Sequence, residues 1–348
     1  MFENDSLTTL DSLGEFGLID RIKNSVKIYN TETKLGIGDD AAVIESNGLQ
    51  TVITTDMLVE GVHFDVQYTP LKHLGYKAVV VNVSDLAAMN ATPKQVTVSL
   101  AISSKYTLEA IEEIYVGINA ACKNFQVDLI GGDTTTAPSG LVISITAIGL
   151  AAKEDIICRN TAAINDLICV TGDLGAAYAG LLILDREKRI FMENSKVQPE
   201  LEGYDYVLEK QLKPEPRLDI IRALKETGIK PTSMIDISDG LSSELIHLCK
   251  SSGTGCRIMT DKLPIALETL NVADELSLPH FTLALNGGED YELLFTVNQN
   301  DYNKLMKMSD LSVIGFITEA TSGYQLVDSE NNIAPLTAQG WNSFKAKF

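Results

Sequence analysis

The stretch Gly36–Asp65 reads GIGDDAAVI, then ESNGLQ, then TVITTDMLVEGVHFD. It places Asp39, Asp40 and Asp56 beside glycines and threonines at the ends of apolar runs. Carboxylates gathered at strand ends are poor core material, because an unpaired buried charge is expensive. They are good ligands for a hard cation such as Mg²⁺, which prefers oxygen and recruits phosphate. The stretch therefore indicates one wall of an acidic, metal-binding cleft for phosphate groups.

Later segments repeat this combination of acidic and small residues. They are VNVSDLAAM with Asp85, LIGGDTT with Asp133, MIDISDGLS with Asp236 and Asp239, and NGGEDYELL with Glu289. Glycines beside Asp133 would let backbone N–H groups approach phosphate oxygens closely. Alternation along a strand puts Asp236 and Ser238 on one face, and the following helix offers its N–H groups to an anion. Each motif alone fits a turn or a helix cap, but together they favour a shared metal and phosphate site.

The composition is that of a globular protein with a strong negative charge. The 348 residues are 45% hydrophobic and 22% charged, and this length favours two domains. The net charge of −19, from 47 acidic and 28 basic residues, disfavours a nucleic-acid or anionic-membrane surface. An ATP site in so acidic a chain requires bound divalent cations that reverse the local sign.

The cysteines and the apolar runs indicate a cytoplasmic location. The five cysteines are odd in number and form no CxxC, which favours reduced, buried thiols. The N-terminal MFENDSLTTLDSL lacks the basic and apolar regions of a signal peptide, and no apolar run is long enough to cross a membrane. We expect no membrane and no nucleic-acid partner.

Strands and helices alternate in both halves, which predicts an α/β (α+β) protein of mixed sandwiches. The character of the sequence changes near residues 151–155, so we place an N-terminal domain at 1–152 and a C-terminal domain at 153–348. Asn47-Gly48 predicts a hairpin between strands at 42–44 and 51–54.

Helices and strands outside the hairpin follow from periodicity and from capping residues. An amphipathic helix is expected at Leu13–Val26, and a helix is expected from Pro70 to about Asn90. In the second half, Phe281–Leu285 is expected to be a strand. Ser238 or Asp239 is expected to cap a helix at Leu241–Cys249.

Some familiar motifs are excluded. Gly36–Ala41 fits the loose dinucleotide pattern G-x-G-x-x-A, but no clear apolar strand precedes it and two aspartates would repel a pyrophosphate. There is no Walker A, HExxH, nucleophile-elbow or protein-kinase catalytic-loop pattern. His63 attracts attention because it follows the metal stretch. Trp341 is the single tryptophan, either a core anchor or a stacking surface for a ligand.

The chain closely resembles the thiamine-monophosphate kinase family in a series of ordered motifs: GEFGLIDRI, GIGDDAAVI, TTDMLVEGVHF, VNVSDLAAM, IGGDTT, DISDGLSSEL and GGEDYELLF. The resemblance runs from about Gly14 to Trp341. The GDD, SDLAAM, GGDT and DISDGL elements are shared with aminoimidazole ribonucleotide synthetase and selenophosphate synthetase. GGEDYELL and TTDMLVEGVHF are more particular to the kinases.

The resemblance implies Mg²⁺-dependent transfer of the ATP γ-phosphoryl group to thiamine monophosphate, giving thiamine diphosphate and ADP. It also implies the two-domain aminoimidazole ribonucleotide synthetase-like fold, with a mixed N-terminal sheet that pairs in a homodimer and a C-terminal α/β sandwich that completes the ATP and substrate cleft. The span 185–213 departs most from the motifs, and no role is assigned to it.

Site residues are implied by the same resemblance. The implied metal ligands are Asp39, Thr54, Thr55, Asp56, Asp85, Asp133, Asp236 and Asp239. The implied ATP contacts are Tyr115, Gly132, Asp133, Arg159 and Ser238. The implied thiamine site is lined by His63, Glu289 and Trp341. Asp133 and Asp236 are expected to act catalytically, by positioning metal and phosphate. The role of Asp40 stays open, as a ligand or as a support for Asp39.

The implied chemistry agrees with the residues. A phosphate monoester has a second pKa of about 6, so the acceptor is largely a dianion near neutral pH and needs no strong general base. Several Mg²⁺ ions on a carboxylate cluster would neutralise both phosphates, and positioning would do most of the rest. The thiazolium cation suits Glu289 by charge and Trp341 by cation–π stacking.

Other functions fit less well. Selenophosphate synthesis uses an N-terminal cysteine, and none precedes Cys122. A ring-closing synthetase needs a separate basic phosphate grip, which the sequence does not show. Hydrogenase-maturation relatives carry a reactive C-terminal cysteine, whereas this tail is WNSFKAKF. A plain divalent-cation-binding module would leave the glycines beside the acids unexplained.

Overall fold

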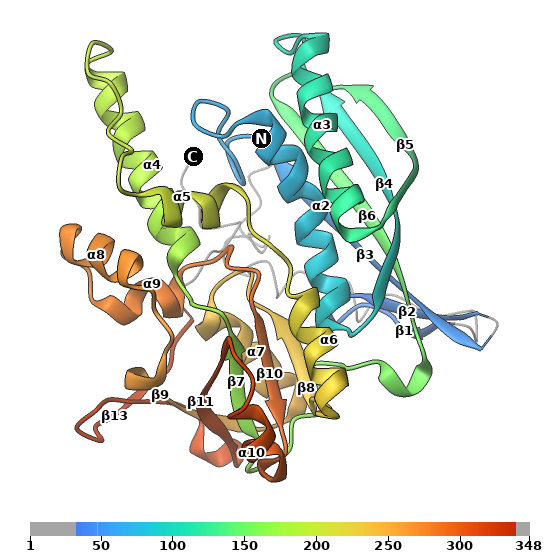
Figure 1. Cartoon of the computed structure of the whole chain (residues 1–348), viewed down its shortest axis with the longest axis vertical. Coiled ribbons are helices and arrows are strands. Elements are labelled where there is room, and N and C mark those ends of the chain that lie inside the picture. Colours follow the sequence, from blue (N-terminus) through green and yellow to red (C-terminus); the bar gives the residue numbers. More distant parts are fainter. Residues whose placement is uncertain (1–32, 47, 339–348) are drawn as a thin grey trace, which may run out of the picture.

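The computed structural model describes residues 33–46 and 48–338. These residues form two mixed sheets, each packed against helices, which confirms the α/β class (Figure 1). The helix expected at Leu13–Val26 and the side chain of Trp341 lie outside the described residues.

The first sheet has six strands in the order β1-β2-β3-β6-β4-β5, with β4 and β5 parallel and the other pairs antiparallel. Its strands are β1 (Thr33–Leu35), β2 (Ala42–Ser46), β3 (Leu49–Val59), β4 (Thr92–Ile102), β5 (Asp128–Thr136) and β6 (Leu141–Ala151). Strands β2 and β3 pair antiparallel around Gly48, whose φ is +84°. The predicted hairpin is therefore confirmed.

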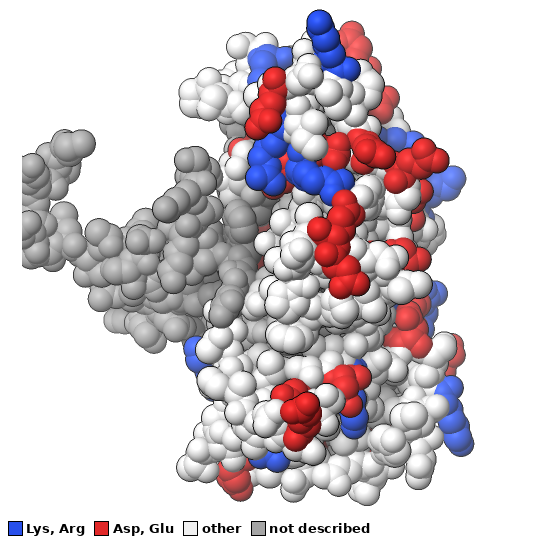
Figure 2. Space-filling view, turned by 90° about the vertical axis from the view of Figure 1, so that its left-hand side faces the viewer, with Lys and Arg blue, Asp and Glu red and all other residues white. Residues whose placement is uncertain are grey.

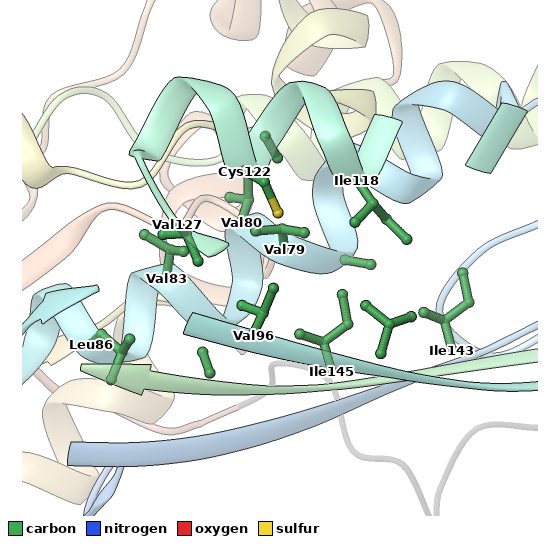
Figure 3. Packing of buried hydrophobic residues seen from close by; sticks show 14 of the residues in the cluster. Val79, Val80, Val83, Leu86, Val96, Ile118, Cys122, Val127, Ile143 and Ile145 are labelled. Carbon is green, nitrogen blue, oxygen red and sulfur yellow. The ribbon is translucent and has the colours of Figure 1, made fainter. Parts of the chain in front are cut away.

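Helices α2 (Leu71–Ala88) and α3 (Leu108–Phe125) cover one face of this sheet (Figure 1). Figure 3 shows Val79, Val83 and Leu86 of α2 packed between Ile118 of α3 and Ile145 of the sheet. The helix expected from Pro70 onward is thus confirmed, and it is buried nearly all round. An apolar helix of this kind is an interior element rather than a surface one.

The contact between α2 and α3 depends on glycines. A Cβ on Gly75 would lie 2.0 Å from the carbonyl oxygen of Ile114, and a Cβ on Gly117 would lie 1.9 Å from that of Lys72. No side chain fits at either position, so the two helix backbones touch. This contact fixes the position of α2, which carries Asp85.

The second sheet has seven strands in the order β13-β12-β9-β11-β7-β10-β8. Its strands are β7 (Leu167–Thr171), β8 (Ser233–Asp236), β9 (Gly255–Met259), β10 (Leu293–Val297), β11 (Leu311–Thr318), β12 (Tyr324–Val327) and β13 (Ile333–Pro335). Only β12 and β9 pair in parallel within this described sheet. The helices of this half are α4 (Ala176–Glu193), α5 (Asp205–Leu212), α6 (Leu218–Thr227), α7 (Leu241–Ser252), α8 (Leu267–Glu275), α9 (His280–Asn286) and α10 (Tyr302–Leu305).

The segment Phe281–Leu285 is a helix, so the strand prediction there is wrong. It lies within α9, which begins after Pro279 and buries Leu283 and Leu285. A short apolar run has no period that separates strand from helix, and tertiary packing decides between them.

The N-cap of α7 also differs from the prediction. The residue at this position is Gly240, with φ of 109° and no side-chain cap. Instead Glu244, inside the first turn of α7, accepts hydrogen bonds from the Asp239 backbone N–H (3.2 Å) and from Ser238 Oγ (3.5 Å). The side chains of Ser238 and Asp239 are therefore not used to cap the helix.

The described helices and the displayed face differ from a membrane span and from a basic surface, respectively. None of the helices among residues 33–46 and 48–338 is long and apolar enough to span a bilayer. Figure 2 shows acidic and basic side chains intermixed on the displayed face, with no continuous basic patch among its described residues.

Gly117→Ala should lower the free energy of unfolding by about 1–3 kcal/mol, because the new methyl group overpacks a backbone contact. The control is Asn119→Ala on the exposed side of the same helix, which should be neutral or slightly stabilising. Urea unfolding measures both. Equal stability of the two variants would contradict the close approach of the helices.

Candidate active site

Carboxylates from three separate segments meet beside α2. One oxygen atom each of Asp40, Asp85 and Asp236 lies within 4.8 Å of the others. Asp40 precedes β2, Asp85 belongs to α2, and Asp236 ends β8 of the second sheet. The cluster is therefore built from both halves of the chain.

Hydrogen bonds orient the carboxylates of this cluster. Thr54 Oγ1 on β3 donates to Asp85 Oδ2 at 2.5 Å. Ser84 Oγ on α2 donates to Asp236 Oδ2 at 2.6 Å, which ties the helix to the second sheet. Asp56 lies two residues after Thr54 and therefore on the same face of β3, and its backbone N–H donates to Asn82 Oδ1 at 3.2 Å. Strand β3 and helix α2 thus face each other with polar groups at this one level.

Burial makes the cluster electrostatically unfavourable without a cation. It raises the pKa of Asp85 well above its ordinary value, and Asp56, Asp236 and Asp40 raise it further. Burial also raises the pKa of Asp236 and, against the opposing Arg159, that of Asp40. The pKa of Asp56 rises to about 6, through burial and the charge of Asp236. Neighbouring buried carboxylates disfavour each other's ionised form.

Arg159 contacts Asp39 and Asp40 in different ways. Its backbone N–H donates to Asp39 Oδ2 (3.2 Å) and its Nε to Asp39 Oδ1 (3.3 Å), while its Nη2 pairs with Asp40 Oδ1. Asp39 is therefore engaged by the arginine, and Asp40 is the residue whose oxygen joins Asp85 and Asp236. The geometry thus places Asp40, rather than Asp39, among the three clustered carboxylates.

The donor set suits a hard divalent cation. Asp40 Oδ2 is buried and has no hydrogen-bond partner among the described residues. A buried carboxylate oxygen of this kind needs a counterion or a proton. Mg²⁺ favours carboxylate oxygens, so Asp40, Asp85 and Asp236 fit it, with Thr54 and Asp56 adjacent.

Glu244 is a site residue that the sequence reasoning missed. It is 4% exposed, and burial together with Asp239, Asp236 and Asp40 raises its pKa well above the ordinary value. It lies in the first turn of α7, five residues after Asp239. The sequence signal was an acid in the first turn of the helix that follows DISDG, where it satisfies N-terminal N–H groups.

Other predicted residues lie away from the cluster within one chain. The Thr55 hydroxyl donates to the carbonyl oxygen of Ile145 (3.1 Å) from the opposite face of β3. Gly132 and Asp133 are exposed on β5. Register across the sheet aligns Gly132 with Asp56 three strands away, which is about 14 Å at the usual strand spacing. Tyr115, on α3, packs against the core of the first half.

Two of the predicted thiamine-site residues, His63 and Glu289, lie in the described part of the chain, one in each half. His63 follows β3, and its Nδ1 accepts a hydrogen bond from the Val59 N–H at 3.0 Å, so the ring proton of the neutral imidazole is on Nε2. Glu289 follows α9, and its backbone N–H donates to the Ser238 carbonyl at 2.7 Å. Glu289 therefore adjoins the DISDG segment.

A separate cavity of about 1010 Å³ lies between the halves, lined by α5, α6 and the ends of α2 and α3. None of the predicted site residues lines it. The polar constellation around Asp85, rather than this cavity, is the candidate site.

Comparison with known proteins assigns this chain to a family. The family model described as AIR synthase related protein, N-terminal domain, matches residues 38–151. The chain is 34% identical over 339 residues to the thiamine-monophosphate kinase of Bacillus subtilis (strain 168), covering 96% of this chain and 100% of the relative. This chain belongs to the thiamine-monophosphate kinase family. A member from Buchnera aphidicola subsp. Schizaphis graminum is 37% identical over 95% of this chain and 98% of its own.

Solved structures of the thiamine-monophosphate kinase family share the fold. AaThiL complexed with AMPPCP and TMP superposes with a TM-score of 0.81 at 30% identity, covering 97% of this chain and 99% of the other. Hydrogenase maturation protein HypE in complex with ATP has a TM-score of 0.67 at 17% identity, covering 86% and 88%, and shares the fold alone.

Mg²⁺ should raise the melting temperature more at about pH 8 than at about pH 5. Carboxyls titrate near pH 4 when unfolded, and Asp56 titrates at about 6 when folded, so the folded state binds the extra proton. Without metal, binding of this extra proton stabilises the folded state at low pH. The stabilisation is lost as pH rises through about 6. A cation then replaces the protons.

Thermal unfolding with and without millimolar Mg²⁺ measures this effect. Asp85→Asn should remove most of the Mg²⁺-dependent rise. Asp65→Asn, whose carboxylate pairs with Lys188 outside the cluster, should keep it. A Mg²⁺ effect that is independent of pH and of Asp85 would exclude this cluster as the metal site.

Proposed function

We propose that this chain is a thiamine-monophosphate kinase, which transfers the γ-phosphoryl group of ATP to thiamine monophosphate and yields thiamine diphosphate and ADP. The observation that carries the proposal is the buried carboxylate cluster of Asp40, Asp85 and Asp236, set between halves that bear the predicted nucleotide and thiamine residues. The full-length similarity to relatives of that name supports it, as does the complex of AaThiL with AMPPCP and TMP.

In this proposal the cluster holds Mg²⁺ through Asp40, Asp85 and Asp236, with Asp39, Thr54, Asp56 and Asp239 adjacent. Bound Mg²⁺ neutralises phosphate charge and orients the transferred group. Thr54 and Ser84 fix the carboxylates that face the phosphates. Arg159 holds Asp39 and Asp40 in place and brings a positive charge to the nucleotide side.

The other task of the protein in this proposal is to position the two substrates. The acceptor dianion needs no base, so the protein has to bring two anions into line and exclude water. Ser238 adjoins both Glu244 and Glu289, and thus links the proposed nucleotide contact to the proposed thiamine contact.

We also propose a homodimer formed through the first sheet, working in the cytoplasm. Strand β5 ends the sheet, and eight of its nine residues are exposed, including Ile130 at 58%. A long exposed edge strand is a template for pairing with another chain. Pairing would also account for Gly132 and Asp133, which lie far from the cluster of their own chain but could reach that of a second copy.

The direct test is a product assay with ATP, Mg²⁺ and thiamine monophosphate. The expected result is ADP and thiamine diphosphate in equal amounts. Release of orthophosphate without thiamine diphosphate would show an ATPase and reject the proposal. Binding of ATP with neither hydrolysis nor phosphoryl transfer would favour a maturation or scaffold role.

The shared site predicts complementation between inactive variants. Asp133→Asn and Asp85→Asn should each lower turnover by at least about a hundredfold, because each disturbs phosphate or metal positioning. If Asp133 serves the partner's site, co-folding equal amounts of the two variants should restore about one quarter of wild-type turnover, since half of randomly paired dimers contain one intact site of two.

The control is each variant co-folded with itself, which should stay inactive. Absence of any recovery in the mixture, with dimers present by light scattering, would show that Asp133 acts within its own chain.

A further inference from the structure

Lys77 is a buried cation that none of the roles above uses. It lies in the second turn of α2 with 5% of its surface exposed. Its ammonium group pairs with Glu289 Oε2 and donates to the Gln211 backbone carbonyl at 2.9 Å. A lysine is rarely buried without a partner, because an isolated ammonium is costly away from water. The Glu289 carboxylate and the Gln211 carbonyl are the partners that the buried ammonium needs.

The backbone of the Glu289 loop is held by the second half of the chain. Glu289 has a φ of +69°, in the left-handed region that side-chain-bearing residues seldom occupy. Its N–H donates to the Ser238 carbonyl (2.7 Å), and the Tyr291 N–H donates to the Ile237 carbonyl (2.9 Å). A Cβ on Gly288 would lie 2.4 Å from the Ser238 carbonyl oxygen. These contacts fix the backbone conformation at Glu289 and therefore the direction of its side chain.

The Glu289 carboxylate accepts hydrogen bonds from three segments of the chain. Lys77 of α2 and Gln211 Nε2 of α5 (3.2 Å) donate to Oε2, and the Tyr291 hydroxyl donates to Oε1 (3.2 Å). Lys77 is the charged member of this set and the one from the first half. The Glu289 side chain is still 25% exposed, so part of it is available to a ligand.

Helix α2 joins this carboxylate to the metal cluster. Lys77 and Asp85 are eight residues apart on the same helix, a separation of about 12 Å at the standard rise. The glycine contact with α3 holds the helix in place. The spacing between the cluster and the Glu289 carboxylate is thus set by one rigid element.

We propose that Lys77 is a positioning residue for thiamine recognition, holding the Glu289 carboxylate oriented at a fixed distance from the carboxylate cluster. This rests on the proposed kinase function. The ammonium offsets most of the carboxylate charge, so Glu289 acts on the thiamine moiety chiefly as a directed hydrogen-bond acceptor. The charge attraction for a thiazolium is correspondingly weakened.

Steady-state kinetics of Lys77→Met test the proposal. The KM for thiamine monophosphate should rise at least about tenfold, while the KM for ATP stays within about twofold, since a charged hydrogen bond to the thiamine-site carboxylate is lost and the nucleotide side is untouched. The matched control is Lys72→Met, an exposed lysine on the same helix, which should leave both constants unchanged. An unchanged KM for thiamine monophosphate in Lys77→Met, or equal rises for both substrates, overturns the proposal.

A double-mutant cycle with Glu289→Gln separates positioning from direct contact. If Lys77 acts through Glu289, then Lys77→Met/Glu289→Gln should match Glu289→Gln alone in its KM for thiamine monophosphate. A further tenfold rise in the double variant would mean that Lys77 contacts the substrate independently, which overturns the proposal. The same comparison serves if Lys77→Met alone does not fold, because the double variant buries no unpaired charge. An inactive wild-type protein would instead refute the kinase function itself.

Discussion

Mutual repulsion among Asp40, Asp85 and Asp236 is the constraint around which the two halves of this protein are arranged. The carboxylates come from a loop, a helix and a strand end, and burial raises the pKa of each. Without a cation they favour protons or separation. Thr54, Ser84 and Arg159 maintain their proximity, so the fold holds an arrangement that protons or a bound cation make favourable.

Helix α2 transmits this constraint to the rest of the molecule. It is buried nearly all round and packs between α3 and the first sheet (Figure 3). It also contacts β8 of the second sheet. This largely apolar helix also carries the polar residues Lys77, Asn82, Ser84 and Asp85. Each reaches a functional loop or strand, so the helix that forms the core also sets the spacing of the site. In the proposed function, bound metal would supply the positive charge for the phosphates, so this acidic protein would need no basic cradle.

The two halves contribute different things to the site. The first half supplies Asp40, Asp85 and the strand β3, whereas the second supplies Asp236, Glu244 and the clamped loop at Glu289. Interactions that cross between them include polar pairs, such as Ser84 with Asp236 and Lys77 with Glu289, and apolar packing of Ala88 with the core of the second half.

The amino-acid sequence by itself determined the family, the α/β class, the hairpin around Gly48 and the helix after Pro70, because these depend on local periodicity, turn chemistry and ordered motifs. It failed at Phe281–Leu285, where a five-residue apolar run has no decisive period. Only the tertiary structure decided that Asp40 joins the cluster while Asp39 is held by Arg159, 120 residues away, and that Lys77 pairs with Glu289 across 212 residues. Such pairings depend on how distant segments pack, which no local pattern encodes.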